Sequence, residues 1–331
     1  MVNTYGGGVP MKVVAILPPS EQVQAQVAMV RALFSGHTVE LATNAAELEP
    51  HLPDAEVLIS TAFTPLTRAM LQAAPRLRFV QVAGVGVDHV DLDAARELGI
   101  TVAAVTGANT VSVAEHVVMV ALALMRGLVP AHNQLAQGQW SLPYWMAHAR
   151  DIQGKTLGIV GMGRIGREVA ARMLPFGVTT FYYDIQPLPP EQEESLGVTY
   201  LELDALLPEC DIVTLHLPLT PETRGLFGRE RLFAMKRGAF LINTARAELV
   251  DEAALVEALQ GHLGGAAIDV FAQEPPPPDH PLLRLPNVVL TPHGAGVTQE
   301  AQQRIAQGVI QNVLRFMEGR PLADVVVQGT R

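Results

Sequence analysis

The segment GIVGMGRIG, residues 158–166, constrains the fold of this chain more than any other, because Gly161, Gly163 and Gly166 separate an apolar run from a helical pattern. In a strand–turn–helix unit the first glycine allows a tight turn and the second allows the backbone to approach a pyrophosphate. The third allows the helix to pack closely on the strand. The free N–H groups at the helix N-terminus then face the phosphates. The segment therefore predicts a dinucleotide-binding βαβ unit.

A second apolar run, TTFYYD, identifies the dinucleotide. It ends at Asp184, eighteen residues beyond Gly166. A carboxylate there can hydrogen-bond a ribose diol and repel a 2′-phosphate. The next residues, Ile185, Gln186 and Pro187, supply no cation for such a phosphate. NAD is thus the predicted cofactor.

Composition excludes several classes of protein. With 331 residues, of which 49% are hydrophobic and 17% charged, the chain can form two ordinary domains. A net charge of −10 with scattered basic residues argues against a nucleic-acid surface. The single cysteine, Cys210, excludes an internal disulfide and favours the cytoplasm. The most apolar helix contains Glu115 and His116, so we expect a buried helix and no membrane span. No Cys/His cluster suggests a metal, and residues 1–10 are expected to be a disordered leader.

Short apolar runs alternate with amphipathic segments along the chain, which predicts parallel strands covered by helices on both faces. The first set of predicted strands covers residues 13–17, 38–42, 57–60, 79–83 and 101–105. The second set covers residues 156–161, 179–184, 211–216, 239–245, 266–270 and 287–292. A long helix is expected between the sets, from about Val111 to Gln137, and a last helix after Thr298, which can act as its N-cap. The predicted fold class is α/β, with two doubly wound parallel-sheet units.

Three side chains that can perform chemistry follow predicted strands. Arg246 follows AFLINTA, Glu274 lies just past AAIDV, and His293 ends NVVLTPH. Ligands of open α/β sheets bind outside the carboxyl ends of the strands. Histidine changes charge near neutrality, and an arginine fork suits a carboxylate. Each residue alone has an ordinary explanation, as a surface arginine, a solvated glutamate beside the proline run or a loop histidine. Their common position predicts a site for hydride transfer.

Five motifs, VGMGRIG, CDIVTLHLPLTPETRGLFG, INTARAELVDEAAL, AAIDVFAQEP and VVLTPHGAG, resemble the D-isomer-specific 2-hydroxyacid dehydrogenase family, over nearly the whole chain from Met11. The resemblance implies two Rossmann-like domains with a cleft between them. The substrate domain would be discontinuous, comprising residues 11–108 plus 297–331, and the NAD-binding domain would comprise residues 109–296. It also implies a homodimer, with the helix near Val113 in the contact.

The same resemblance implies roles for individual residues. Arg246 orients the substrate, His293 is the general acid/base and Glu274 is its partner. VAGVGVDHVD is similar to a substrate loop, in which the backbone N–H groups of Val85 and Gly86 bind the carboxylate. The implied cofactor contacts are Gly161, Gly163, Arg164, Ile165, Gly166, Asp184, Leu217, Pro218, Thr244 and Asp269.

Two substrate classes remain open. GVGVDHVDL, GITVAAVTGANTVSVAEHVVM and EGRPLADVVVQG resemble NAD-dependent formate dehydrogenases of the same superfamily. There the counterpart of Asn109 holds formate, and the partner of the histidine is a glutamine. Here that partner is Glu274, nineteen residues before His293. We therefore predict an enzyme that interconverts a 2-keto acid and a D-2-hydroxy acid with NAD. Formate oxidation is the alternative, and a non-catalytic NAD-binding sensor or co-regulator is the second alternative.

Overall fold

The chain divides into two compact units. Unit 1 comprises Met1–Asn109 and Thr298–Arg331, and unit 2 comprises Thr110–Val297. The computed structural model describes residues 10–16, 31–32, 34–61 and 64–331. Most of the expected leader, residues 1–9, lies outside the described residues.

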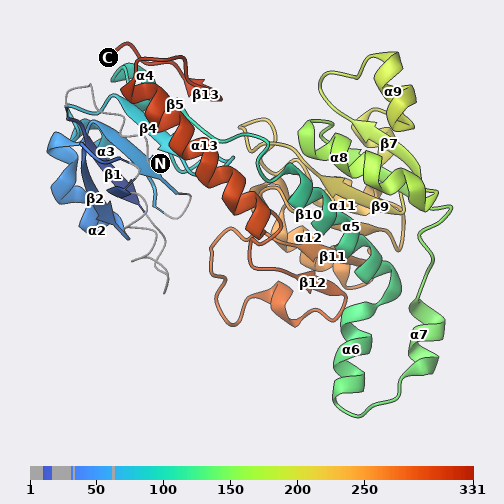
Figure 1. Ribbon diagram of the computed structural model, residues 1–331. Helices are drawn as coiled ribbons and strands as arrows, with labels where there is room; N and C mark the ends of the chain where they lie inside the picture. Colours follow the sequence, from blue (N-terminus) through green and yellow to red (C-terminus); the bar gives the residue numbers. More distant parts are fainter. Residues whose placement is uncertain (1–9, 17–30, 33, 62–63) are drawn as a thin grey trace. The chain divides into compact units, whose positions relative to one another are not determined.

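Unit 2 is built on a parallel sheet in the order β12-β11-β10-β9-β6-β7-β8 (Figure 1). Its strands are β6 Thr156–Val160, β7 Thr179–Tyr183, β8 Val198–Tyr200, β9 Ile212–Leu215, β10 Phe240–Asn243, β11 Gly265–Ile268 and β12 Val288–Leu290. The strand order reverses between β6 and β9. In open α/β sheets such a reversal opens a crevice at the carboxyl ends, where dinucleotides bind.

Helices cover both faces of this sheet, and a separate apolar core lies under each face. One core joins the sheet to α5 Thr110–Arg126 and α8 Arg164–Met173. The other joins it to α10 Leu203–Leu206, α11 Arg229–Ala234 and α12 Glu252–Leu259. The remaining elements are α9 Pro190–Leu196, η2 Leu174–Phe176, η3 Ala247–Leu249 and η4 Pro281–Arg284. Because β9, β10 and β11 are buried along their whole length, they appear in the sequence as uninterrupted apolar runs.

The prediction of a single long helix from Val111 to Gln137 is wrong. It is broken into α5 and α6 Leu128–Ala136, which are bent by 64° at Gly127, a residue with a left-handed φ of 58°. Pro130 explains the break, because it has no N–H for the carbonyl of Arg126. That carbonyl accepts a hydrogen bond from the indole of Trp145 instead.

Trp145 lies on α7 Leu142–His148, and no residue of α6 or α7 is buried in the described structure. Figure 1 shows both helices extending away from the sheet. Within the described residues no single helix is long and apolar enough to cross a membrane. The pair α5 and α6 passes that test only together, across its bend, and α5 packs in the core of unit 2.

The described part of unit 1 forms a second sheet, in the order β13-β5-β4-β3-β1-β2. All neighbours are parallel except β13, which pairs antiparallel with β5. The strands are β1 Lys12–Ile16, β2 Thr38–Ala42, β3 Val57–Ser60, β4 Phe79–Val82, β5 Thr101–Ala103 and β13 Val325–Val327. The helices are α2 Ala45–Leu48, η1 Glu49–Asp54, α3 Arg68–Gln72, α4 Leu92–Glu97 and α13 Gln299–Met317.

The chain returns to unit 1 through α13, which begins where the sequence predicts. The hydroxyl of Thr298 accepts a hydrogen bond from the N–H of Ala301, 3.1 Å away, and so caps the helix. The buried face of α13 places Val309 and Val313 in the core beside Phe79. The predicted α/β class, with two doubly wound units, is confirmed.

Candidate active site

The glycine turn after β6 has the geometry of a dinucleotide cradle. Gly161 has a φ of 101°, and a Cβ added there would lie 2.8 Å from the carbonyl of His216. A Cβ on Gly166 would lie 2.2 Å from the oxygen of Gly161, so only glycine lets α8 pack this closely on the turn. A Cβ on Gly163 would meet no described atom within 4 Å. The backbone is therefore open to a ligand at the point where α8 begins.

Two neighbouring strand ends complete this side. Asp184 follows β7, and its carboxylate accepts hydrogen bonds from the N–H groups of Met162, at 2.7 Å, and Gln186, at 3.2 Å. The acid that the sequence assigns to the ribose thus also links the glycine turn to β7. The predicted cofactor residues Arg164 and Ile165 form the first turn of α8, Arg164 exposed and Ile165 half-buried.

Leu217 and Pro218 follow β9, next to His216. The N–H of His216 donates to Val160 at 2.8 Å, and its ring nitrogen Nε2 lies 3.0 Å from the hydroxyl of Thr214. Burial lowers the pKa of His216 to about 3, because the charged imidazole would lose its hydration. This histidine is neutral, and it fixes the chain that borders Gly161.

The loop after β10 presents Arg246. The side-chain amide of Asn243 closes this loop at both ends, donating to the carbonyl of Arg246 at 2.8 Å and accepting from the N–H of Ala245 at 3.1 Å. The hydroxyl of Thr244 is buried and has no hydrogen-bond partner among the residues that the structure describes. An unsatisfied buried hydroxyl needs a partner, and a bound ligand can supply one. With the open turn at Gly163, Thr244 shows that this edge of the sheet fits NAD.

The structure brings together His293 and Glu274. Nδ1 of His293 lies 2.8 Å from one carboxylate oxygen of Glu274, and the other oxygen accepts from the N–H of Phe271 at 3.0 Å. The two side chains are 47% and 35% exposed within this structure. At that exposure an ion pair stabilises the fold by only about 0–1 kcal/mol. The contact instead orients the imidazole, with Nδ1 towards Glu274 and Nε2 left for another partner.

The turn that carries His293 is organised around Asp269. Asp269 is 1% exposed, and its carboxylate accepts from the hydroxyl of Thr291 at 2.5 Å, and from the N–H groups of Gly294 at 2.8 Å and Ala295 at 3.0 Å. Its backbone carbonyl accepts from the N–H of His293 at 2.7 Å. The expected contact of Asp269 with the cofactor stays a prediction, and the structure adds its role in the turn.

His293 itself has a φ of 53°, the left-handed region that a residue other than glycine enters at a cost of roughly 1–3 kcal/mol. The hydrogen bonds to Asp269 hold this conformation. Arg246, Glu274 and His293 therefore follow β10, β11 and β12, three adjacent strands, at the same edge as the glycine turn. An arginine, a paired imidazole and a dinucleotide cradle on one edge can bind a small anion and support hydride transfer.

The predicted substrate contacts Val85, Gly86 and Asn109 belong to unit 1. Val85 and Gly86 are half-buried in the loop after β4, and Asn109 ends the first segment of the unit. Their roles stay predictions. Within the described residues, no group of three or more His, Cys, Asp or Glu side chains could hold a metal ion.

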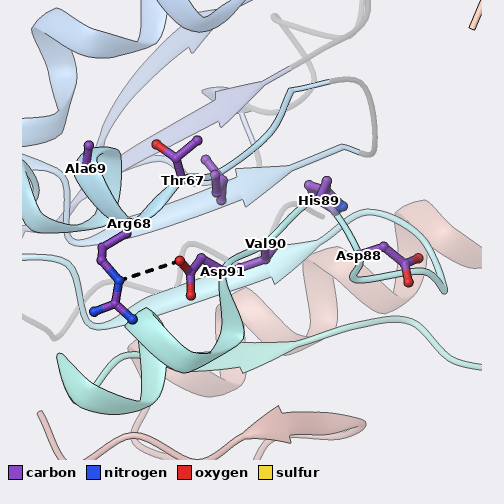
Figure 2. A pocket seen from close by; sticks show the side chains of 8 residues that line it. Thr67, Arg68, Ala69, Asp88, His89, Val90 and Asp91 are labelled. Atoms are coloured by element: carbon purple, nitrogen blue, oxygen red, sulfur yellow. Dashed lines mark ion pairs between the residues drawn. The ribbon is translucent and has the colours of Figure 1, made fainter. Parts of the chain in front are cut away.

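Figure 2 shows a hollow of about 470 Å³ in unit 1, lined by Leu66–Ala69 and Asp88–Asp91. None of the predicted site residues lines it. The only guanidinium in its lining belongs to Arg68, which pairs with Asp91 at 3.8 Å and also with Glu97. We do not assign the hollow to the reaction.

Sequence reasoning missed Asn243, Thr291 and the contact of Thr291 with His116 on α5, where Oγ1 and Nε2 are 3.2 Å apart. One signal was present in the sequence. Glu115 and His116 are adjacent polar residues in an otherwise apolar helix, and such residues need a partner.

One family model and several named proteins match this chain. Residues 118–295 match the family described as "D-isomer specific 2-hydroxyacid dehydrogenase, NAD binding domain". The formate dehydrogenase of Arabidopsis thaliana chloroplasts and mitochondria is 43% identical over 288 residues, which cover 85% of this chain and 75% of that protein. The formate dehydrogenase of Pseudomonas sp. (strain 101) is 41% identical over 305 residues, covering 89% and 76%.

Solved structures give a similar result. The NAD-dependent formate dehydrogenase of Staphylococcus aureus in complex with NAD has a TM-score of 0.89 and 41% identity, covering 97% of this chain and 100% of that one. The D-lactate dehydrogenase of Aquifex aeolicus, complexed with NAD and lactic acid, has a TM-score of 0.88 and 31% identity, covering 96% and 100%. The predicted cofactor, NAD, is confirmed by the matched NAD-binding domain and by the neighbour that contains NAD.

Proposed function

The chain belongs to the D-isomer specific 2-hydroxyacid dehydrogenase family, and we propose that within this family it is an NAD-dependent formate dehydrogenase. The predicted family resemblance is thereby confirmed, as is the general activity, NAD-dependent dehydrogenation. Sequence analysis favours a 2-keto acid as the substrate and formate as the alternative. The observation that carries the proposal is the 41–43% identity to proteins named formate dehydrogenase, over at least 83% of this chain.

The chemistry of formate fits the residues of unit 2. Oxidation breaks the C–H bond, so that the carbon leaves as CO₂, and no proton has to move. Bound NAD supplies the acceptor for the hydride. Arg246 would bind the carboxylate through its planar fork. The doubly protonated ring of His293, with Nδ1–H on Glu274, would donate a hydrogen bond from Nε2–H to a carboxylate oxygen. The imidazole orients the anion here and does not exchange a proton with it.

One observation favours 2-keto acid reduction as the second candidate. The partner of His293 is the carboxylate of Glu274, at 2.8 Å, where the resemblance implies a glutamine for formate enzymes. When hydride reaches C2 of a keto acid, the carbonyl oxygen must gain a proton. A carboxylate beside the imidazole stabilises the protonated ring that would donate it.

The deciding experiment compares initial rates of the unmodified chain at one pH. NADH formation is followed with formate and NAD, and NADH consumption with glyoxylate, hydroxypyruvate, pyruvate and phenylpyruvate. We expect a higher kcat/KM with formate than with any keto acid. Keto-acid turnover without formate turnover would establish the second candidate instead. NAD binding without either reaction would support the second alternative, a non-catalytic NAD-binding sensor or co-regulator.

A substitution at Arg246 tests the anion site. Arg246→Lys should raise KM and lower kcat, because an ammonium group cannot make the paired contact of a guanidinium. Arg229→Lys is the matched control, since Arg229 is an exposed arginine of unit 2 that pairs with Glu257. The melting temperature of both variants should stay close to that of the parent. Parent-like kinetics for Arg246→Lys would remove this residue from the site.

We also propose that the protein forms a homodimer through α6 and α7. These helices expose large apolar side chains, and such patches mark interaction surfaces. The exposed residues are Leu128, Val129, Leu135, Leu142, Tyr144 and Met146 on the helices, and Trp140 in the turn between them. A second copy of the chain can cover them with the same surface. Sedimentation should give twice the chain mass, and Leu135→Glu with Met146→Glu should give the monomer. A parent that sediments as a monomer would contradict the proposal.

A further inference from the structure

The buried carboxylate of Asp269 is connected to α5 by a chain of hydrogen bonds. The hydroxyl of Thr291 lies 2.5 Å from Oδ1 of Asp269 and 3.2 Å from Nε2 of His116. α5 packs against β10, β11 and β12, and it delivers the half-buried His116 to this point.

The direction of these hydrogen bonds follows from the number of protons. A threonine hydroxyl has one proton, and a carboxylate can only accept. The proton of Thr291 therefore goes to Asp269, and the hydroxyl must accept from His116. Nε2 of His116 thus carries a hydrogen, whichever charge the ring has. The series of hydrogen bonds therefore runs from His116 through Thr291 to Asp269.

This series of hydrogen bonds ends on the backbone of the turn that carries His293. Asp269 accepts from the N–H groups of Gly294 and Ala295, which directly follow His293. His293 has a φ of 53°, so its position depends on these contacts and not on an intrinsic backbone preference. A change in the orientation of Asp269 would move the imidazole of His293 relative to its partner Glu274.

We propose that His116 is a positioning residue for the reaction: its Nε2–H holds Thr291 and Asp269 in the arrangement that places His293. This rests on the proposed function only in treating His293 as a residue that contacts substrate, and it holds for formate and for keto acids alike. Burial lowers the pKa of His116, and the charge of Asp269 opposes that shift without cancelling it. A neutral ring with hydrogen on Nε2 supplies the donor that Thr291 needs.

The test separates the donor from simple packing. His116→Leu removes the N–H but fills the space, whereas His116→Gln restores a donor near the position of Nε2. His132→Gln, on the surface of α6, is the control. We expect His116→Leu to lower kcat about 10- to 100-fold, as small misplacements of catalytic groups do. His116→Gln should recover most of the loss. Equal kinetics of the Leu and Gln variants would overturn the proposal.

A second pair of variants covers the case in which His116→Leu fails to fold. Thr291→Val removes the hydroxyl while keeping the shape, and Thr291→Ser keeps the hydroxyl. We expect the Val variant to lose kcat and the Ser variant to retain it. Parent-like kcat in Thr291→Val would refute the proposal that hydrogen bonds from α5 position Asp269.

One readout does not depend on the substrate. Modification of His293 by diethyl pyrocarbonate, resolved by mass spectrometry, reports how firmly the imidazole is held. It should be faster in His116→Leu and parent-like in His116→Gln. If the parent fails to oxidise formate, the proposed function is wrong, but this rate still decides the role of His116. An unchanged rate in His116→Leu would contradict the positioning role even in an active formate dehydrogenase.

Discussion

The two halves of the carboxyl edge of the unit 2 sheet differ in the chemical groups that form them. At β6, β7 and β9 the edge is formed mainly by backbone N–H groups, glycines and a neutral histidine, His216, together with one acid, Asp184. At β10, β11 and β12 it carries ionisable side chains: Arg246, Asp269, Glu274 and His293. The first half suits a large ligand that is recognised by its phosphates and ribose. The second suits a small anion whose bonds change.

The difference predicts which kinetic constant each half controls. Backbone groups that bind a cofactor equally before and after hydride transfer set its affinity. Side chains whose interactions strengthen in the transition state set the rate. Substitutions at Arg246, Glu274 and His293 should therefore change kcat, and substitutions in the β6–β9 half should change NAD binding or cofactor choice.

The largest effect is expected from His293→Ala. Loss of the imidazole should lower keto-acid reduction by on the order of 10²–10⁴, and should also lower formate oxidation, because both use the same ring. NADH affinity, measured by fluorescence titration, should stay within a few-fold of the parent. A parallel loss of NADH affinity would show that the two halves are not separable, and that His293 serves the structure.

The next effect concerns Glu274. Glu274→Gln removes the negative charge beside the imidazole while leaving a hydrogen-bond acceptor for Nδ1–H. Keto-acid reduction should then be slower than in the parent, because no carboxylate stabilises the protonated ring that gives its proton to the carbonyl oxygen. Formate oxidation, which moves no proton, should persist or improve. Equal kcat/KM values of the two proteins with every substrate would mean that Glu274 is a solvated loop residue.

The cofactor half should show a smaller effect, on choice of cofactor alone. NADH should be preferred over NADPH by about tenfold or more, because Asp184 would face the 2′-phosphate. Asp184→Ala should narrow that preference and slightly weaken NADH binding, since the hydrogen bond to Met162 is also lost. The ratio of kcat/KM values for the two cofactors measures this. Equal efficiency in the parent would contradict the assignment of Asp184.

The last effect is on stability in acid and not on the kinetics. The pKa of His216 in the folded chain, about 3, lies below its ordinary value of 6.5. As pH falls below 6.5, the unfolded chain binds a proton that the folded chain does not, so folding is weakened progressively towards pH 3. His216→Gln should show a smaller drop in melting temperature between neutral and acid pH. An identical drop would indicate that His216 titrates normally.

The sequence could predict the glycine turn and the acid Asp184 beside it, because glycine spacing and strand-end acids are local patterns. It also located Arg246, Glu274 and His293, since each lies within a few residues of the end of an apolar run. It could not predict the hydrogen bonds around Asp269. The partners of its carboxylate follow β12 and connect through Thr291 to His116 on α5, so they meet only in the folded chain.

Two errors in the predicted secondary structure also have physical causes. The bend at Gly127 was missed because the apolar pattern continues across it, although Pro130 marks the lost hydrogen bond. The strands β8 and β13 were not predicted, because each is three residues long and, unlike the equally short β5 and β12, is not part of a longer apolar run.

The hydrogen bond at this bend also gives the protein two unlike optical reporters. The chain has two tryptophans. Trp145 is fixed at the base of α7, with its N–H on the carbonyl of Arg126 and that guanidinium 5.7 Å from its ring. Trp140 is 77% exposed in the isolated chain. Intrinsic emission should therefore contain a constant component from Trp145 and a hydrated one from Trp140. A blue shift with rising protein concentration, abolished by Trp140→Phe, would follow association of α6 and α7 without any label.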